Sequence, residues 1–161
     1  AYADWISSQT GFAYRLLSEA EWEDAARAGS QDKFFFGNED LELCEYANVA
    51  DKTMRTRFRD WSVLACDDGY VRTAPVGSYQ PNQFGIFDIY GNVAEWVLDC
   101  GMPQYDKAPT DGSAVVEGVS CQNHSYRGGS WDSSPIESSS AYRNASSSRN
   151  NDRGVRIMRE L

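Results

Sequence analysis

Oxygen-bearing side chains gather in two turn-rich parts of the chain, and their types suit calcium. The segments ANVAD and CDDGYV supply Asn48 and Asp68, while FDIYGNVAEW supplies Asp88 and Glu95, with Gly91 permitting a sharp turn between them. Calcium takes about six to eight oxygens from carboxylates, amides and backbone carbonyls held by turns. The residue types alone leave a second interpretation open, in which these side chains simply cap their turns.

Four cysteines, Cys44, Cys66, Cys100 and Cys121, are spread along a chain that has one histidine, His124. The spacing contains no CxxC pair and is poor for zinc. An even cysteine count in an acidic, loop-rich chain favours two disulfides and an oxidising compartment over free thiols. Three pairings are possible. The sequential pairing closes two short loops, each worth about 3 kcal/mol in the chain-entropy account.

Residues for hydrolytic chemistry are present without a pattern that assembles them. A Ser-His-Asp triad would need His124, which we expect to be a loop residue near Cys121. Asp67 and Asp68 could serve a hydrolase as a carboxylate pair, but DDG is first a turn and a candidate metal loop. These residues do not by themselves predict an enzyme.

The segment from Ser130 to Arg153 is dominated by Ser, Asn, Asp, Tyr and Arg. This composition is close to that of binding loops, where small polar groups adapt and a few aromatic rings anchor. In the alternative interpretation Trp131 and Arg143 hold the turn and pair with buried carboxylates, while the serines face water. Gly128 and Gly129 favour the structural role for Trp131, because adjacent glycines mark close backbone packing. The expected ligand-binding residues are Trp131, Asp132, Ser133, Ser138, Tyr142, Arg143, Asn144 and Arg149.

The length, composition and net charge of the chain indicate a folded, globular protein. The length of 161 residues fits one domain with its own core, and 13% aromatic with 24% charged residues is a globular composition. A net charge of -9 argues against a nucleic-acid partner, which needs a clustered basic surface. The apolar stretches are far shorter than the roughly 20 residues of a membrane span. No basic region followed by an apolar region opens the sequence, so we expect any signal peptide to lie outside it.

Few regular elements are available to position the candidate residues. The stretch from Ser18 to Gly29 predicts a helix, with Ser18 as its cap, Glu21 completing a capping box and Gly29 ending it in a left-handed turn. AYADWISSQTG predicts the last turns of an amphipathic helix with Tyr2 and Trp5 on one side. After these two helices the sequence predicts a loop-rich body of mixed α and β structure.

Four motifs in order, YRLLSEAEWEDAARAG, the run from DDGYV to EWVLDC, YRGGSWD and RGVRIMREL, resemble the formylglycine-generating enzyme family, also called sulfatase-modifying factors. The resemblance implies an α+β, C-type-lectin-like fold with little regular secondary structure. It implies a single domain over residues 1–161 that lacks the N-terminal portion of the family fold. Such a domain could be a subunit that completes its fold with a partner chain or in a larger complex.

The resemblance also assigns cysteines and metal ligands. It pairs Cys44 with Cys66 and Cys100 with Cys121. It implies two calcium sites, the first from Asn48, the Val49 carbonyl, Asp68 and the Tyr70 carbonyl. The second would use Asp88, the carbonyls of Gly91 and Val93, and Glu95. Asp88 stands where some relatives have asparagine, an exchange that calcium tolerates.

Active family members hold copper with two cysteines in the segment after RGGS. Here the matching positions fall near Ser133 and Ser138, and no cysteine follows Cys121. A serine hydroxyl is a hard, neutral ligand that does not replace a thiolate on Cu(I). We therefore expect calcium rather than copper, and no formylglycine-generating activity.

The C-terminal frame from RGGSW to RGVRIM also resembles variable proteins of diversity-generating retroelements, whose matching segments vary and are rich in Asn, Ser, Asp and Tyr. The sequence thus predicts a non-catalytic ligand-binding or assembly module that is periplasmic, secreted or at the cell surface. Its ligand would be a protein or a small molecule. The alternatives are an oxidase related to the family but without the cysteine pair, and a subunit of a larger extracytoplasmic complex.

Overall fold

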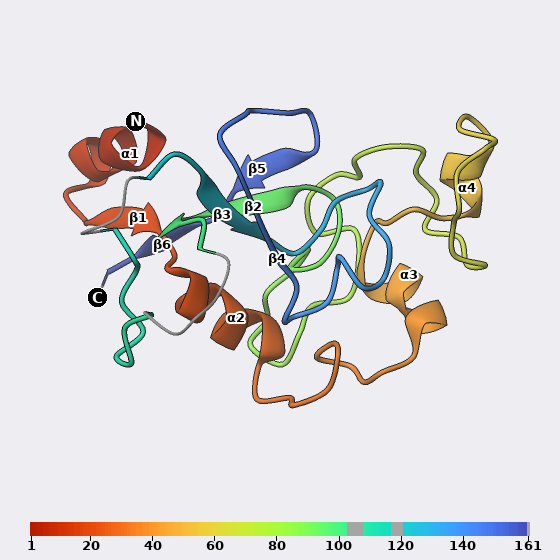
Figure 1. The fold of residues 1–161 in the computed structure, drawn as a ribbon, viewed down its shortest axis with the longest axis horizontal. Helices are drawn as coiled ribbons and strands as arrows, with labels where there is room; N and C mark the ends of the chain where they lie inside the picture. The colour runs from red at the N-terminus through yellow and green to blue at the C-terminus, as the bar shows by residue number, and fades with distance from the viewer. Residues whose placement is uncertain (103–107, 117–120, 161) are drawn as a thin grey trace.

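A computed structural model describes residues 1–102, 108–116 and 121–160 (Figure 1). The chain opens with helix α1 (Tyr2–Thr10), which ends at Gly11 in a left-handed turn with φ of 76°. Strand β1 (Tyr14–Leu16) and helix α2 (Glu19–Arg27) follow. Both helices were predicted from the sequence.

Helix α2 has the expected capping box. Ser18 Oγ accepts a hydrogen bond from the Glu21 amide at 3.1 Å, and Glu21 Oε2 accepts one from the Ser18 amide at 2.8 Å. The helix ends slightly earlier than predicted, because Ala28 already adopts a left-handed conformation with φ of 46° before Gly29. Trp22 and Ala26 form its fully buried face.

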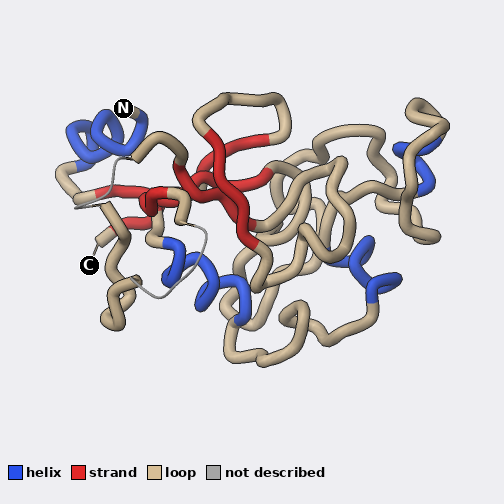
Figure 2. Tube along the Cα trace, viewed as in Figure 1, coloured by secondary structure: helices blue, strands red, loops and turns tan. Residues whose placement is uncertain are grey.

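The middle of the chain is mostly irregular. It holds the 3-10 turn η1 (Asp40–Glu42) and the short helices α3 (Leu43–Tyr46) and α4 (Lys52–Arg55). From there to β2 (Ala94–Cys100) the chain forms turns and loops, which fill one side of the molecule in Figure 2. This low content of regular structure agrees with the predicted α+β class.

The central sheet has four strands in the order β4-β3-β2-β5. Strand β3 (His124–Arg127) is antiparallel to both β2 and β4 (Arg143–Ser146), whereas β5 (Arg153–Val155) runs parallel to β2. Strand β6 (Ile157–Arg159) returns to pair with β1, so the two ends of the chain meet in a two-stranded sheet. The serine-rich segment is therefore enclosed between strands and is not a loose tail.

The main core lies between α2, the sheet and the aromatic run at residues 34–36. Trp22, Phe34, Leu43 and Tyr90 are fully buried there. A smaller cluster packs Trp131 against Ala50 and Met54, among other apolar side chains. Within the described residues, no helix is long and apolar enough to cross a membrane.

Two disulfides join the loops, as predicted. Cys44 pairs with Cys66 and Cys100 with Cys121, across Cα distances of 6.1 and 5.3 Å. The first staples α3 to the loop that carries Asp68. The second ties the end of β2 to the chain just before β3.

Candidate functional site

The turn that follows β3 is fixed by two glycines. Gly128 and Gly129 both adopt left-handed backbone conformations, with φ of 89° and 69°. A Cβ on Gly128 would lie 2.8 Å from the Ile89 carbonyl oxygen, and one on Gly129 would lie 2.6 Å from Ser138 Oγ. Only glycine fits these positions without displacing a neighbour. The turn thus holds the start of the serine-rich segment against the core.

A cavity of about 260 Å³ opens beside this turn. It contains four of the predicted ligand-binding residues, Asp132, Ser133, Tyr142 and Asn144. The remaining lining residues were not predicted to bind a ligand: Trp61, Ala94, Tyr126, Arg127, Gly129, Ser130, Glu137 and Asp152.

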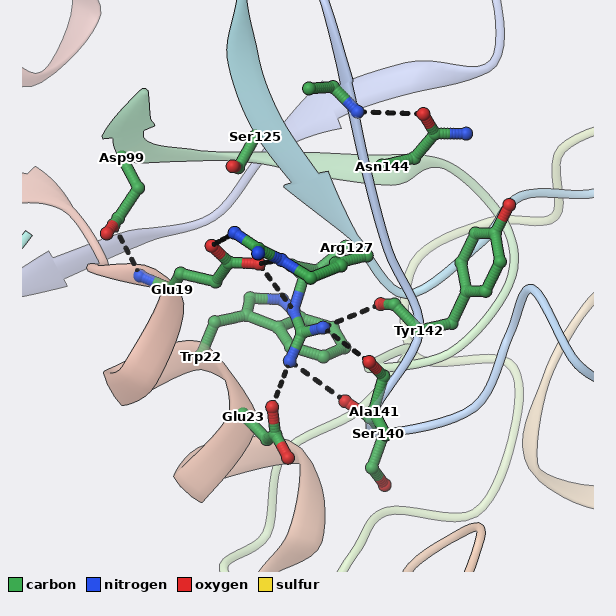
Figure 3. Close-up of polar contacts among 12 residues, drawn as sticks. Glu19, Trp22, Glu23, Asp99, Ser125, Arg127, Ser140, Ala141, Tyr142 and Asn144 are labelled. Atoms are coloured by element: carbon green, nitrogen blue, oxygen red, sulfur yellow. Dashed lines mark hydrogen bonds and ion pairs between the residues drawn. The ribbon is translucent and has the colours of Figure 1, made fainter. Parts of the chain in front are cut away.

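Arg127 fixes one wall of the cavity. Its side chain is fully buried, and its Nη1 donates to the carbonyl oxygens of Ala141 at 3.0 Å and Tyr142 at 2.7 Å. Its Nη2 donates to the Ser140 carbonyl at 3.0 Å and to a carboxylate oxygen of Glu23. Figure 3 shows the guanidinium between helix α2 and the segment 140–142. Arg127 therefore anchors the segment that carries Tyr142.

A second ion pair extends this network. Arg143 donates through Nε to Glu19 Oε1 at 2.7 Å and through Nη2 to Glu19 Oε2. The Glu19 amide in turn donates to Asp99 Oδ2 at 2.7 Å, which joins the start of α2 to β2 (Figure 3). Arg143 thus pairs with a buried carboxylate, as its structural interpretation requires.

The other predicted surface residues do not all lie together. Trp131 is 5% exposed and packs in the smaller core, so the structure favours its structural role over a role as ligand anchor. Ser138 is fully buried, and its Oγ has no hydrogen-bond partner among the described residues. Arg149 lies outside the cavity, in a larger and more open hollow of about 500 Å³ that it lines with His124 and Val155.

The first group of candidate calcium ligands, Asn48, Val49, Asp68 and Tyr70, comes together around the Asp68 carboxylate. Its Oδ2 accepts a hydrogen bond from the Val49 amide at 2.8 Å, and its Oδ1 accepts one from the Tyr70 amide at 2.9 Å. Asn48 Oδ1 is buried and accepts no hydrogen bond from the described residues, while its Nδ2 donates to the Arg72 carbonyl at 2.7 Å. Burial raises the pKa of Asp68 to about 6. A buried acceptor and a desolvated carboxylate suit a bound cation.

A second carboxylate, that of Asp51, belongs to this group and was not predicted. Ligand atoms of Asp51, Asp68 and Cys44 lie within 4.8 Å of one another. Cys44 is in a disulfide and offers no thiolate, so the usable ligands are the oxygens. Asp51 Oδ2 also accepts the Asp68 amide at 2.7 Å, which orients the loop.

The second group of candidate calcium ligands contains Asp88 and Glu95, and an arginine neutralises part of its negative charge. Arg156 donates to both Glu95 oxygens at 2.7 to 3.0 Å, and Trp22 Nε1 donates to Glu95 at 2.8 Å. Burial raises the pKa of Glu95, and Arg156 opposes that shift. Asp88 Oδ1 is buried with no hydrogen-bond partner among the described residues. Asp88 therefore keeps one oxygen without a partner among the described residues, whereas the charge of Glu95 is already balanced by Arg156.

Comparisons with known proteins identify the scaffold. The sequence model of the sulfatase-modifying factor enzyme 1-like domain matches residues 1–161. The chain belongs to the sulfatase-modifying factor family. It is 37% identical over 101 residues to a formylglycine-generating enzyme of Thermomonospora curvata, a match that covers 62% of this chain and 29% of that protein.

Solved structures give the same fold. PvdO from Pseudomonas aeruginosa matches with a TM-score of 0.85 and 42% identity, over 99% of this chain and 57% of that one. Treponema denticola variable protein 1 matches with a TM-score of 0.65 and 28% identity, over 91% of this chain and 47% of that one. The C-type-lectin-like family fold predicted from the sequence is confirmed. The chain spans only part of these relatives, less than a third of the Thermomonospora enzyme.

Ser133 and Ser138, which the family resemblance places near the copper-binding positions, do not suit copper. Ser133 Oγ accepts the Ser130 amide at 3.0 Å at the cavity wall, whereas Ser138 Oγ is buried against Gly129. All four cysteines of the chain are consumed in the two disulfides. Neither hydroxyl is a soft ligand for Cu(I).

Proposed function

We propose that this chain is a non-catalytic ligand-binding or assembly module, whose ligand site is the cavity beside the RGGS turn. The observation that carries the proposal is a cavity that reaches Ser133, one of the two positions where the family resemblance places copper-binding cysteines, and whose lining includes serine hydroxyls and no thiol. Loss of the thiolate pair removes the copper chemistry, and what remains is a recess with converging polar and aromatic side chains. Such recesses are typical of binding sites.

Three further features support a binding role. The walls are held by buried contacts, the Arg127 network and the Gly128–Gly129 turn, so a ligand would meet a preorganised surface. Two disulfides favour a periplasmic, secreted or cell-surface location. The likeness to a Treponema variable protein supports the idea that residues 130–153 face a ligand, and that this segment is the variable one.

Calcium is proposed as a structural ion in the first oxygen group. Asn48 and Asp68 would hold it through their side chains, and the carbonyls of Val49 and Tyr70 would complete the set. The buried Asn48 Oδ1, which accepts no hydrogen bond from the residues that the structure describes, supports this assignment. For the second group, with Asp88, Gly91, Val93 and Glu95, only the Asp88 oxygen supports an ion, because Arg156 already balances Glu95. When bound, the ion would crosslink loops without taking part in chemistry.

The site is tested by a ligand screen read out by amide and indole NMR shifts of the isotope-labelled chain. Binding that shifts the Trp61 indole and the amides of Tyr126, Tyr142 and Asn144 supports the proposal. Ligands that shift only residues remote from the cavity contradict it.

The alternative is an oxidase without the cysteine pair. The observation in its favour is that the cavity still holds groups able to move protons, Glu137 and Asp152 with Tyr126 and Tyr142. Oxygen uptake that depends on a ligand, and disappears in a Glu137→Gln variant, would support the oxidase. A third role, as a subunit of a larger complex, is tested by gel filtration, in which a monomer of 18.0 kDa counts against it.

A further inference from the structure

More negative than positive side chains line the cavity. Asp132, Glu137 and Asp152 line it together with one cation, Arg127. The Arg127 guanidinium is fully buried and committed to Glu23 and to three backbone carbonyls, and its Nε lies 3.7 Å from Glu19. Its charge is therefore neutralised on the side of α2 (Figure 3). The cavity is left with an excess of negative charge.

Each carboxylate keeps an oxygen that no described residue satisfies. Asp132 Oδ1 accepts Ser130 Oγ at 2.5 Å, and Glu137 Oε2 accepts the amide and hydroxyl of Ser134 at 2.8 and 2.7 Å. These bonds fix the two carboxylates and leave Asp132 Oδ2 and Glu137 Oε1 without a partner among the described residues. Asp152 Oδ1 is buried and makes no hydrogen bond to them either.

The nearby cations offset this charge only in part. Arg153 Nε lies 3.8 Å from Asp152 Oδ1, but its guanidinium stacks over the Tyr126 ring at 4.3 Å and donates to the Ser148 carbonyl at 2.7 Å. Arg72 stacks over Trp131 at 5.5 Å. Neither arginine is among the residues that line the cavity.

Aromatic rings complete the walls. Trp61 is 42% exposed and lies on the cavity with Tyr126 and Tyr142. Aromatic faces attract organic cations, and carboxylates attract them more strongly. Anions are disfavoured by the charge. A bare metal ion would use the carboxylates but gain nothing from three aromatic rings.

We propose that this cavity binds an organic cation, an alkylammonium or guanidinium group the size of a lysine or arginine side chain. The inference rests on the proposed binding function of the same site. The cavity volume of about 260 Å³ lies below the usual range for drug-sized ligands, which suits one side chain or a small amine. Asp132 and Glu137 receive the N–H donors, and the rings of Trp61 and Tyr142 flank the alkyl stem and the charge.

The test is an NMR titration with two matched probes, N-acetyl-lysine methylamide and its side-chain-acetylated, uncharged counterpart. The charged probe should shift the Trp61 indole and the Tyr142 amide, bind at least about tenfold more tightly than the neutral one, and weaken as salt rises. The D132N/E137Q double variant should lose about tenfold in affinity for the charged probe. The matched control is D60N, which removes an exposed carboxylate next to Trp61 that does not line the cavity.

The contrary outcomes separate failure of the organic-cation inference from failure of the proposed binding function. Equal binding of the two probes overturns the organic-cation inference. So do cavity shifts produced by calcium chloride alone, in the absence of an effect of the charged probe. If a neutral or anionic ligand binds the cavity and the charged probe does not, the inference fails while the proposed binding function stands. If nothing binds the cavity, both fail. The probe comparison uses the unaltered protein, so it decides even where the double variant does not fold.

Discussion

Arg127 and Tyr142 are joined by a 2.7 Å hydrogen bond from the buried guanidinium to the backbone carbonyl oxygen of the tyrosine. Through this bond the end of β3 fixes the segment that carries one wall of the cavity. The same guanidinium reaches Glu23 on α2, so the serine-rich segment is tied to the first half of the chain. The wall of the cavity that carries Tyr142 is thus fixed to the core.

Replacing Arg127 should be strongly destabilising. Arg127→Ala leaves three backbone carbonyl oxygens without donors and removes one of the two arginines that pair with Glu23, which keeps Arg27. The expected cost is about 3–5 kcal/mol of unfolding free energy, most of it from the unsatisfied carbonyls. Arg127→Lys should lose less stability than Arg127→Ala, because it keeps the positive charge. It should still be less stable than the unaltered chain, because lysine lacks the planar guanidinium fork. Denaturant unfolding measures both. The exposed Arg149→Ala is the control and should change stability by less than about 0.5 kcal/mol. Equal effects at the two positions would refute the anchoring role.

Gly129→Ala should cost more than Gly11→Ala. Both glycines have left-handed backbones, with φ of 69° and 76°, so each alanine carries a backbone penalty of about 1–2 kcal/mol. At Gly129 the added Cβ also meets Ser138 Oγ at 2.6 Å, whereas nothing lies within 4 Å of the position at Gly11. The difference between the two melting temperatures therefore measures how tightly the turn packs on Ser138. Equal losses would mean that the turn can relax.

Calcium should stabilise the chain through the first oxygen group. At about 100 times its dissociation constant, an ion that binds only the folded state adds about 2.7 kcal/mol. Asp68→Asn should remove most of this gain, because it deletes a carboxylate at the site. Glu39→Gln, an exposed position outside both groups, should keep it. Thermal melts with chelator and with added calcium make the measurement, and a melting temperature that chelator leaves unchanged contradicts the site.

The ion pair between Arg15 and Glu21 should make stability depend on pH in the acid range. Two hydrogen bonds from Arg15, both 2.7 Å, hold the pKa of Glu21 at about 2, below its ordinary value of 4.5. Because the folded-state pKa is the lower one, the contribution is complete above about pH 4.5 and is lost as the pH falls toward 2. Glu21→Gln should therefore be less stable than the unaltered chain at pH 7, and the gap should shrink below pH 4.5. A gap that is constant down to pH 2 would show that the carboxylate charge contributes nothing.

The sequence predicted the elements that have local signals. The spacing of Ser18 and Glu21 predicted α2, and the chain after it was correctly expected to be loop-rich. The disulfide pairing followed from the family resemblance, since the spacing alone left three pairings open. Helices α3 and α4 were not predicted, because four-residue helices have almost no intrinsic stability and form only through tertiary contacts.

The cavity was predictable only on one side. Composition pointed to Asp132, Ser133, Tyr142 and Asn144, which lie in the serine-rich segment. Trp61 lines the same cavity from a loop distant in sequence, and no local sequence pattern predicts that contact. Composition also suggested that serines face solvent or ligand, yet Ser138 is buried, because Gly129 lets the backbone approach so closely.

The most direct test of the central claim is oxygen uptake by the copper-treated protein with a cysteine-containing peptide, with the peptide mass followed in parallel. We expect an uptake rate equal to that of the same copper and peptide without protein, and no aldehyde product, because serines stand where the family resemblance places the two copper-binding cysteines. Protein-dependent oxygen uptake with conversion of the peptide cysteine to an aldehyde would contradict it.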